Sequence, residues 1–463
     1  MKKIVSITSI FLSLGLLCAV GGCTLNIPNP NLSSDPNAIT NASTARSLLA
    51  DAYASYPHYE YELSILGNDF TPTNLTGKDV SIQNLYRWQD NALTNLAERM
   101  WVGYYHTATL CDVLLERAPK IATLTAEEEK DKEAIILEGK VLKAMCYFQL
   151  LRLFAPAFDQ NPQGEGIVLK SRIGVEEKKR DSKEACVAQI RSWLAEATAQ
   201  TYQPQQNGWL SSMAAHYLLA EVELYAGNYE AVIEHASKVI DLNASNLLSD
   251  EQFEFIWGKA SSPYRIFAFY TTDKYYTNIQ YDENEGDFFA IAPALSFADT
   301  DSRKPLYTYS KEMDGQTRTL LGKYNANNKD GRGNTYIDMM RPAGLYLIAT
   351  EAYAHIPGKE ATCLQMLNCF RAWHHLPALQ GLQGEKLIQA ILEEKYREFV
   401  GEGRNIFDLK RTHKNQLKRT GAWGKGTQGE ISPEDYRWTL PIPASEYKYN
   451  KSINQNRGWP INH

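Results

Sequence analysis

The amino-acid sequence predicts a mainly helical fold, in which antiparallel helix pairs form a scaffold beside an irregular, loop-rich region with short strands. Apolar residues recur at helical spacing through most of the 463 residues, which favours helices over strands. Two short turns, Gly227-Asn228 and Pro357-Gly358, separate pairs of such helices. Residues 251–310 hold 15 aromatic residues in 60 positions, against 11% in the whole chain. This change of composition marks the irregular region.

Residues 1–22 predict a signal peptide that is removed before the fold forms. Lys2 and Lys3 precede an apolar run that ends in Gly21-Gly22-Cys23. Small residues before a cysteine are typical of a bacterial lipoprotein signal, in which a peptidase cuts before Cys23 and the thiol then carries a diacylglycerol. The alternative is an ordinary secretory signal in which Cys23 is incidental. Residues 23–40, rich in Asn, Pro and Ser, are expected to form an irregular tether.

A long helix is expected at residues 127–154, at the centre of the fold. Acidic residues at its start suit the positive end of the helix dipole, and Ala155-Pro156 ends it. Its second half, from Val141 to Phe148, is apolar nearly all round, which is typical of a buried helix. Two amphipathic helices are predicted before it, at residues 44–54 and 96–115.

Two helix pairs follow the central helix and resemble tetratricopeptide units. The first pair is predicted at residues 212–225 and 229–240, and the second at 345–354 and 361–373. In the helix at 229–240 the apolar residues form one stripe, which must pack on its partner helix. Such an array serves either as a surface for partners or simply as packing.

Two irregular stretches are the places where a ligand site is expected. They are residues 63–90 and the aromatic-rich 251–310, where alternation at 264–269 predicts a short strand and 282–287 a polar loop. Loops on a rigid scaffold carry binding sites more often than the scaffold's own helices do.

Charge and hydropathy exclude two classes of protein. With 48 Lys and Arg against 54 Asp and Glu, the chain lacks the clustered positive charge that a duplex-DNA binder needs. After the signal peptide, no stretch reaches the 18 or so uninterrupted apolar residues of a membrane span. We therefore expect a folded protein that binds no nucleic acid and is tethered to a membrane by lipid alone.

No catalytic, metal or cofactor motif is present in the sequence. There is no GxSxG, HExxH or P-loop, and His374-His375 cannot share one helical face. The cysteines of the mature chain have no CxxC spacing, so buried free thiols are expected. They are Cys111, Cys146, Cys186, Cys363 and Cys369.

A row of three carboxylates needs separate consideration, since paired acids can hydrolyse glycosides. Glu394, Glu398 and Glu402 fall on one helical face at spacings of four. Basic residues soon after them are positioned to pair with this row, namely Arg404, Lys410 and Arg411. We therefore predict an ion-pair network rather than a glycosidase site.

Several segments, in order along the chain, resemble the SusD/RagB family of outer-membrane nutrient-uptake lipoproteins. They are Trp101, Tyr105 and Asp112; Leu142-Lys143-Ala144; Tyr346 to Ala352; Leu367 to Arg371; Ile391 to Phe399; Glu402 to Arg411; Pro441-Ile442-Pro443 with Glu446; and Asn450 to Gly458. Three positions depart from the family pattern: Asp112 stands for Asn, Lys143 for Arg, and Asn405 takes the place of an arginine that here comes one residue early, as Arg404.

The resemblance implies a SusD-like fold over residues 41–463, with an N-terminal part at about 41–240 and a C-terminal part at about 241–463. It also implies a lipid-anchored protein of the outer membrane, exposed at the cell surface, that passes oligosaccharides to a TonB-dependent transporter of the SusC type. No cofactor, metal or catalytic activity is implied. A RagB-like oligopeptide ligand is the first alternative, and a tetratricopeptide-like assembly protein is the second.

Aromatic rings suit sugars because the C–H face of a pyranose packs flat on them, while polar side chains bond the hydroxyls. By the resemblance, the ligand contacts come from the two irregular stretches. On this basis the expected ligand contacts are Asp69, Trp88, Asn91, Tyr275, Tyr276 and Tyr281. For each of them, core packing or plain surface exposure is the alternative.

Overall fold

The computed structural model describes residues 39–73, 80–204, 208–243, 256–259, 261–271, 289–313, 315–324, 335–414, 416–419 and 430–461. The predicted signal peptide, Cys23 and nearly all of the predicted tether lie outside these residues, as do the loop at 282–287 and Tyr275, Tyr276 and Tyr281. Within them the chain is mainly helical, which confirms the predicted fold class.

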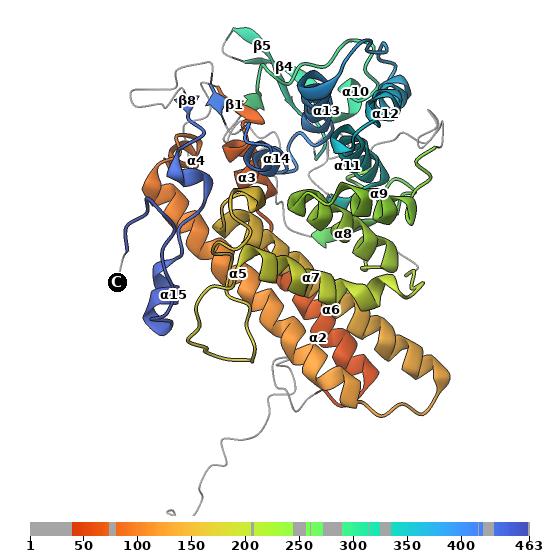
Figure 1. The fold of residues 1–463 in the computed structure, drawn as a ribbon, viewed down its shortest axis with the longest axis vertical. Coiled ribbons are helices and arrows are strands. Elements are labelled where there is room, and N and C mark those ends of the chain that lie inside the picture. The colour runs from red at the N-terminus through yellow and green to blue at the C-terminus, as the bar shows by residue number, and fades with distance from the viewer. Residues whose placement is uncertain are drawn as a thin grey trace, which may run out of the picture.

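Long helices of the N-terminal half pack side by side (Figure 1). The central one, α6, begins at Ala126 behind a capping box of Thr125 and Glu128 and ends at Phe154. Its second half is buried all round, as predicted. The long helices are α2 (Ala42–Ser55), α5 (Asp90–Arg117), α6 (Ala126–Phe154) and α7 (Lys183–Thr198).

The two predicted helix pairs are confirmed. They are α8 (Ser212–Ala226) with α9 (Tyr229–Ser237), and α11 (Pro342–His355) with α12 (Glu360–Trp373). Gly227 and Gly358 make the turns with φ of 77° and 78°, a conformation that favours glycine. The pairs stack on each other, because α11 packs on both α8 and α9. The α9 helix ends at Ser237 rather than at the predicted Ile240.

The stretch at 63–90 is less irregular than predicted. It contains the end of α3 (Glu60–Leu66) and all of α4 (Val80–Tyr86). Each of these helices has seven residues, too few to show a clear helical period. The irregular part of this stretch is therefore shorter than predicted, because α3 and α4 occupy part of it.

Four two-stranded antiparallel sheets occur in the described part of the chain. The predicted strand at 264–269 is present but shifted to Phe267–Thr271. The strand pairs are β1 (Phe70–Pro72) with β3 (Phe289–Ile291), β2 (Phe267–Thr271) with β6 (Thr335–Met340), β4 (Thr308–Met313) with β5 (Gln316–Leu321), and β7 (Leu417–Lys418) with β8 (Glu430–Ile431).

The C-terminal segment returns to the N-terminal helices. The indole N–H of Trp101 on α5 donates to Glu446 on α15 at 3.1 Å, so two segments far apart in the sequence meet there. The remaining helices are α10 (Lys304–Tyr307), α13 (Gly384–Glu398), α14 (Asn405–Arg411), α15 (Ala444–Tyr449) and the short 3₁₀ turns η2 (Ala118–Lys120), η3 (Phe158–Gln160) and η4 (Tyr436–Trp438). None of the helices described is long and apolar enough to cross a bilayer.

Two of the unusual positions noted in the sequence are partners in space. The ammonium of Lys143 on α6 lies 2.5 Å from a carboxylate oxygen of Asp112 on α5. Both residues are largely buried, and an ion pair there needs both charges. The aspartate and the lysine therefore compensate for each other across the α5–α6 interface.

Candidate functional site

The β1–β3 sheet joins the two stretches in which a ligand site was predicted. Its strands are antiparallel, with Pro72 opposite Phe289 and Phe70 opposite Ile291. The N–H of Ala292 also donates to the carbonyl of Asp69 at 2.9 Å. Positions more than 200 residues apart along the chain are therefore neighbours at this sheet.

Most of the aromatic rings that the structure describes in the stretch at 251–310 fill the core, so its composition does not by itself make a binding face. The rings of Trp257, Phe267 and Phe269, for example, are buried. Among the described large apolar residues of this stretch, Tyr270 is the exposed one, at 52%. The exposed face is thus carried by Tyr270, which the sequence analysis did not select.

Tyr270 and Tyr336 form a cross-strand pair on the β2–β6 sheet. They are directly opposite in the register, and their ring centroids lie 5.5 Å apart at 52°. The guanidinium of Arg265 lies 4.8 Å from the centre of the Tyr336 ring and is held by two hydrogen bonds to Asp338, at 2.5 and 3.0 Å. A fixed cation behind an aromatic pair makes a rigid surface that is open on the Tyr270 side.

Of the predicted ligand-binding residues, Asp69 is fully buried. One of its carboxylate oxygens accepts the N–H of Gly401 at 2.9 Å, just after α13. Burial raises the pKa of Asp69 to about 7, although the bonds from Gly401 and Ser64 act in the opposite direction. In this position Asp69 fixes the start of β1 against the turn at 401–405.

This raised pKa predicts that the contribution of Asp69 to the free energy of unfolding decreases as the pH rises. Below pH 4 the carboxyl carries a proton in both the folded and the unfolded chain. Between about pH 4 and pH 7 the unfolded chain ionises first, so the contribution of Asp69 to stability is lost as pH rises through this range. In urea unfolding at several pH values, the stability of the wild type minus that of Asp69→Asn should fall from pH 4 to pH 7. A difference that rises or stays constant would contradict this assignment.

Trp88 is also buried, at 1% exposure. Its ring meets that of Trp438 edge to face at 4.7 Å, and its carbonyl accepts a bond from Arg437 at 2.6 Å. Asn91 is exposed in the first turn of α5. Of the three predicted residues that the structure describes, Asn91 alone presents its side chain to solvent.

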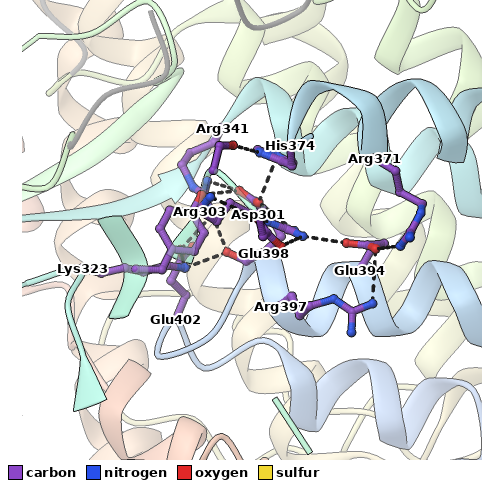
Figure 2. A network of polar contacts seen from close by, with 12 residues as sticks. Asp301, Arg303, Lys323, Arg341, Arg371, His374, Glu394, Arg397, Glu398 and Glu402 are labelled. Carbon is purple, nitrogen blue, oxygen red and sulfur yellow. Dashed lines mark hydrogen bonds and ion pairs between the residues drawn. The ribbon is translucent and has the colours of Figure 1, made fainter. Parts of the chain in front are cut away.

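The carboxylate row lies within a buried charge network (Figure 2). Glu394 accepts from Arg303 at 2.9 Å and also bonds Arg371. Glu398 lies 2.5 Å from Arg341. Burial alone would raise the pKa of Glu394, but Arg303 and Arg397 outweigh it and hold that pKa at about 2. The predicted ion-pair network is confirmed, although it lies in the core rather than on a helix surface.

The predicted cationic partners of this row were wrong. Arg404 pairs with Glu221 at 2.6 Å, and Arg411 with Glu351 at 2.7 Å. Lys410 donates to backbone carbonyls at the end of α6. Apart from Arg397, which pairs with Glu394 three positions away at 3.2 Å, the true partners come from segments distant in sequence, namely Arg303, Lys323, Arg341 and Arg371.

The thiols of Cys111, Cys146, Cys186 and Cys363 are free and buried, as predicted, and that of Cys369 is free but only partly buried. His374 is buried and His375 turns away with a φ of 55°. No group of three or more metal-ligating side chains is found among the residues that the structure describes.

Comparisons with known proteins agree with this architecture. The family model of the SusD family matches residues 185–459. Two SusD superfamily proteins of known structure are similar over 90% or more of this chain. The one from Bacteroides vulgatus shares 20% identity at a TM-score of 0.77, and the match covers 91% of this chain and 100% of that one. The one from Bacteroides thetaiotaomicron shares 21% identity at a TM-score of 0.74, and the match covers 90% of this chain and 100% of that one.

A third similar structure is a SusD-like carbohydrate-binding protein from Bacteroides vulgatus. It shares 16% identity with this chain at a TM-score of 0.76, and the match covers 89% of this chain and 97% of that one. At these identities the likeness establishes a common fold. A comparison with curated proteins finds no match.

Proposed function

Because the chain belongs to the SusD family, which confirms the resemblance of its motifs, we propose that it captures an oligosaccharide at the cell surface and passes it unaltered to a SusC-like TonB-dependent transporter. A lipid on Cys23 would hold it to the outer membrane. The observation that carries the proposal is the exposed Tyr270 beside Tyr336, on the strand that leads into the segment with Tyr275 and Tyr276.

The chemistry of this surface suits a sugar ring. An exposed tyrosine offers a flat face to the C–H groups of a pyranose. Tyr336 supports Tyr270 from the partner strand β6, and Arg265, just before β2, packs on the Tyr336 ring, so little side-chain freedom is lost on binding. A rigid aromatic platform is more consistent with a saccharide than with an extended peptide, which needs backbone partners.

The other predicted residues take two roles in this proposal. Asn91, Tyr275, Tyr276 and Tyr281 are proposed as further ligand contacts. Asp69 and Trp88 are proposed to position the loops rather than to touch the ligand, because both are buried.

The test is glycan binding by the soluble protein without residues 1–23. On a glycan array followed by calorimetry, we expect binding to at least one oligosaccharide, and Tyr270→Ala should weaken it about tenfold, since an aromatic contact contributes about 1 kcal/mol beyond its buried area. Tyr449→Ala is the matched control, because Tyr449 is similarly exposed, at 57%, but lies on α15. The affinity of Tyr449→Ala for the oligosaccharide should equal that of the wild type.

Two outcomes would replace this proposal. Binding of mixed oligopeptides in place of glycans would favour the RagB-like alternative. Binding of neither would favour the assembly protein, and turnover of a bound oligosaccharide by the purified protein would contradict a pure binding role.

A further inference from the structure

A crevice lies where α6, α8 and α14 meet. It encloses about 620 Å³ of space, part of it open to solvent. A second cavity of about 590 Å³ adjoins it. The two share their boundary at Phe148, Arg152, Glu221, Arg404 and Phe407, so Arg152 stands at the point where they join.

The guanidinium of Arg152 packs on two phenyl rings. Its central carbon lies 4.3 Å from the ring centre of Phe148 on α6 and 4.1 Å from that of Phe407 on α14. One nitrogen donates to Gln149 at 2.9 Å. Ring packing does not use the N–H groups of the guanidinium, and these groups are the part that binds carboxylates.

Arg152 has no counter-ion among the described residues. No carboxylate lies within ion-pairing distance of it in this part of the chain, and its Nε is buried without a hydrogen-bond partner there. The nearest acid of the crevice, Glu221, is engaged by Arg404 at 2.6 Å. Partial burial of an arginine without an acid is unfavourable, which makes Arg152 a natural site for an anion from outside.

The other charges of the crevice do not supply the missing anion. Lys395 and Arg411 share Glu351 and Asp408 at 2.7–2.8 Å, two cations with two acids. Within the described residues Lys410 also lacks an acid, since its ammonium bonds the carbonyls of Arg152 and Ala155, at 2.9 and 2.7 Å. The crevice therefore carries an excess of positive charge.

From this geometry we propose that the crevice binds a small organic carboxylate, whose anionic group meets the edge of Arg152 and whose body packs on the aromatic wall. Tyr225, Phe399 and Phe407 line that wall. Arg152, Arg404, Phe407 and Arg411 are only partly buried and form the mouth. This site shares no residue with the Tyr270 surface, so it would act beside the proposed glycan capture and not as part of it.

The test uses D-glucuronate and benzoate as probes and D-glucose as the neutral control, measured by calorimetry on the soluble protein. At least one carboxylate should bind and D-glucose should not, with an affinity that falls as salt is raised. Arg152→Gln should weaken binding about tenfold or more, because a charge-assisted bond is lost. The control is Arg191→Gln, which removes an arginine on α7 that pairs with Glu223 on α8. Its affinity for the carboxylate should equal that of the wild type.

A second variant keeps the proposal testable if Arg152→Gln does not fold. Glu221→Gln removes the acid beside Arg152 and Arg404, so it should strengthen carboxylate binding about threefold or more. Loss of folding would lower affinity, whereas this variant is expected to raise it. No binding of either carboxylate, equal affinity of Arg152→Gln and wild type, or weaker binding by Glu221→Gln would each overturn the proposal.

Discussion

We expect Glu398→Ala to lower the free energy of unfolding by about 3–5 kcal/mol, the cost of breaking a buried ion pair from one side. Glu398 is 1% exposed. It accepts bonds from Arg341 at 2.5 Å and from the hydroxyl of Tyr307 at 2.9 Å. Removing the carboxylate deprives the buried guanidinium of Arg341 of one of its ion-pair partners and leaves the buried hydroxyl of Tyr307 without its acceptor.

The size of this effect follows from the balance of charges in the network (Figure 2). Burial by itself would raise the pKa of Glu398, yet that pKa is lowered because Arg341, Arg303 and Lys323 surround the carboxylate. The ionised form is therefore the one that the fold requires. Arg341 retains Glu402 at 2.8 Å, which keeps the loss below that of an isolated buried charge.

A matched control lies on the same helix. Glu393 is exposed, and its one bond within the described part of the chain is accepted from Gln389 at 3.2 Å, so Glu393→Ala should change stability by less than about 0.5 kcal/mol. Urea unfolding followed by circular dichroism measures both variants. Equal losses in the two variants would show that the network does not stabilise the fold.

The sequence was sufficient for those elements whose information is local. The central helix α6 was predicted because its acidic start, its apolar surface and the Ala155-Pro156 that ends it all lie within residues 127–156. The turns at Gly227 and Gly358 were visible for the same reason. The helices α3 and α4 were missed because seven residues carry too little periodicity, and tertiary packing decides their state.

The candidate site depends on information that is not local. Tyr270 forms the proposed platform only together with Tyr336, and no spacing in the sequence predicts that these two residues lie opposite each other in the sheet. Composition marked the stretch as aromatic, but it did not distinguish the exposed Tyr270 from the buried Phe269 beside it. The partners of Glu398 were missed likewise, since Arg341 lies 57 positions away.

The turn after α13 shows how a short motif is fixed by a distant segment. Gly403 N–H donates to the hydroxyl of Ser64 at 2.8 Å, and the amide of Asn405 donates to the carbonyl of Gly67 at 2.6 Å. The departure from the family pattern at Asn405 thus has a structural role. Through these bonds the turn at 401–405 supports α3 and the start of β1, close to the candidate site.

Gly403→Ala should therefore lower the free energy of unfolding by about 2–5 kcal/mol, from a strained backbone of about 1–2 and overpacking of about 1–3. Gly403 has a φ of 68°, and a Cβ there would lie 2.9 Å from both the Cα and the carbonyl oxygen of Glu60. These are backbone atoms of α3, which cannot move aside as a flexible side chain would.

Gly358→Ala separates the two causes, because Gly358 has nearly the same backbone conformation, with a φ of 78°, but open space around it. It should cost only about 1–2 kcal/mol, the strain of the left-handed conformation alone. Chemical denaturation measures the loss in unfolding free energy of each variant. The loss in Gly403→Ala minus that in Gly358→Ala is the cost of the steric overlap between residue 403 and α3. Equal costs would mean that the contact with Glu60 relaxes freely, so that this turn does not fix α3 against the C-terminal half.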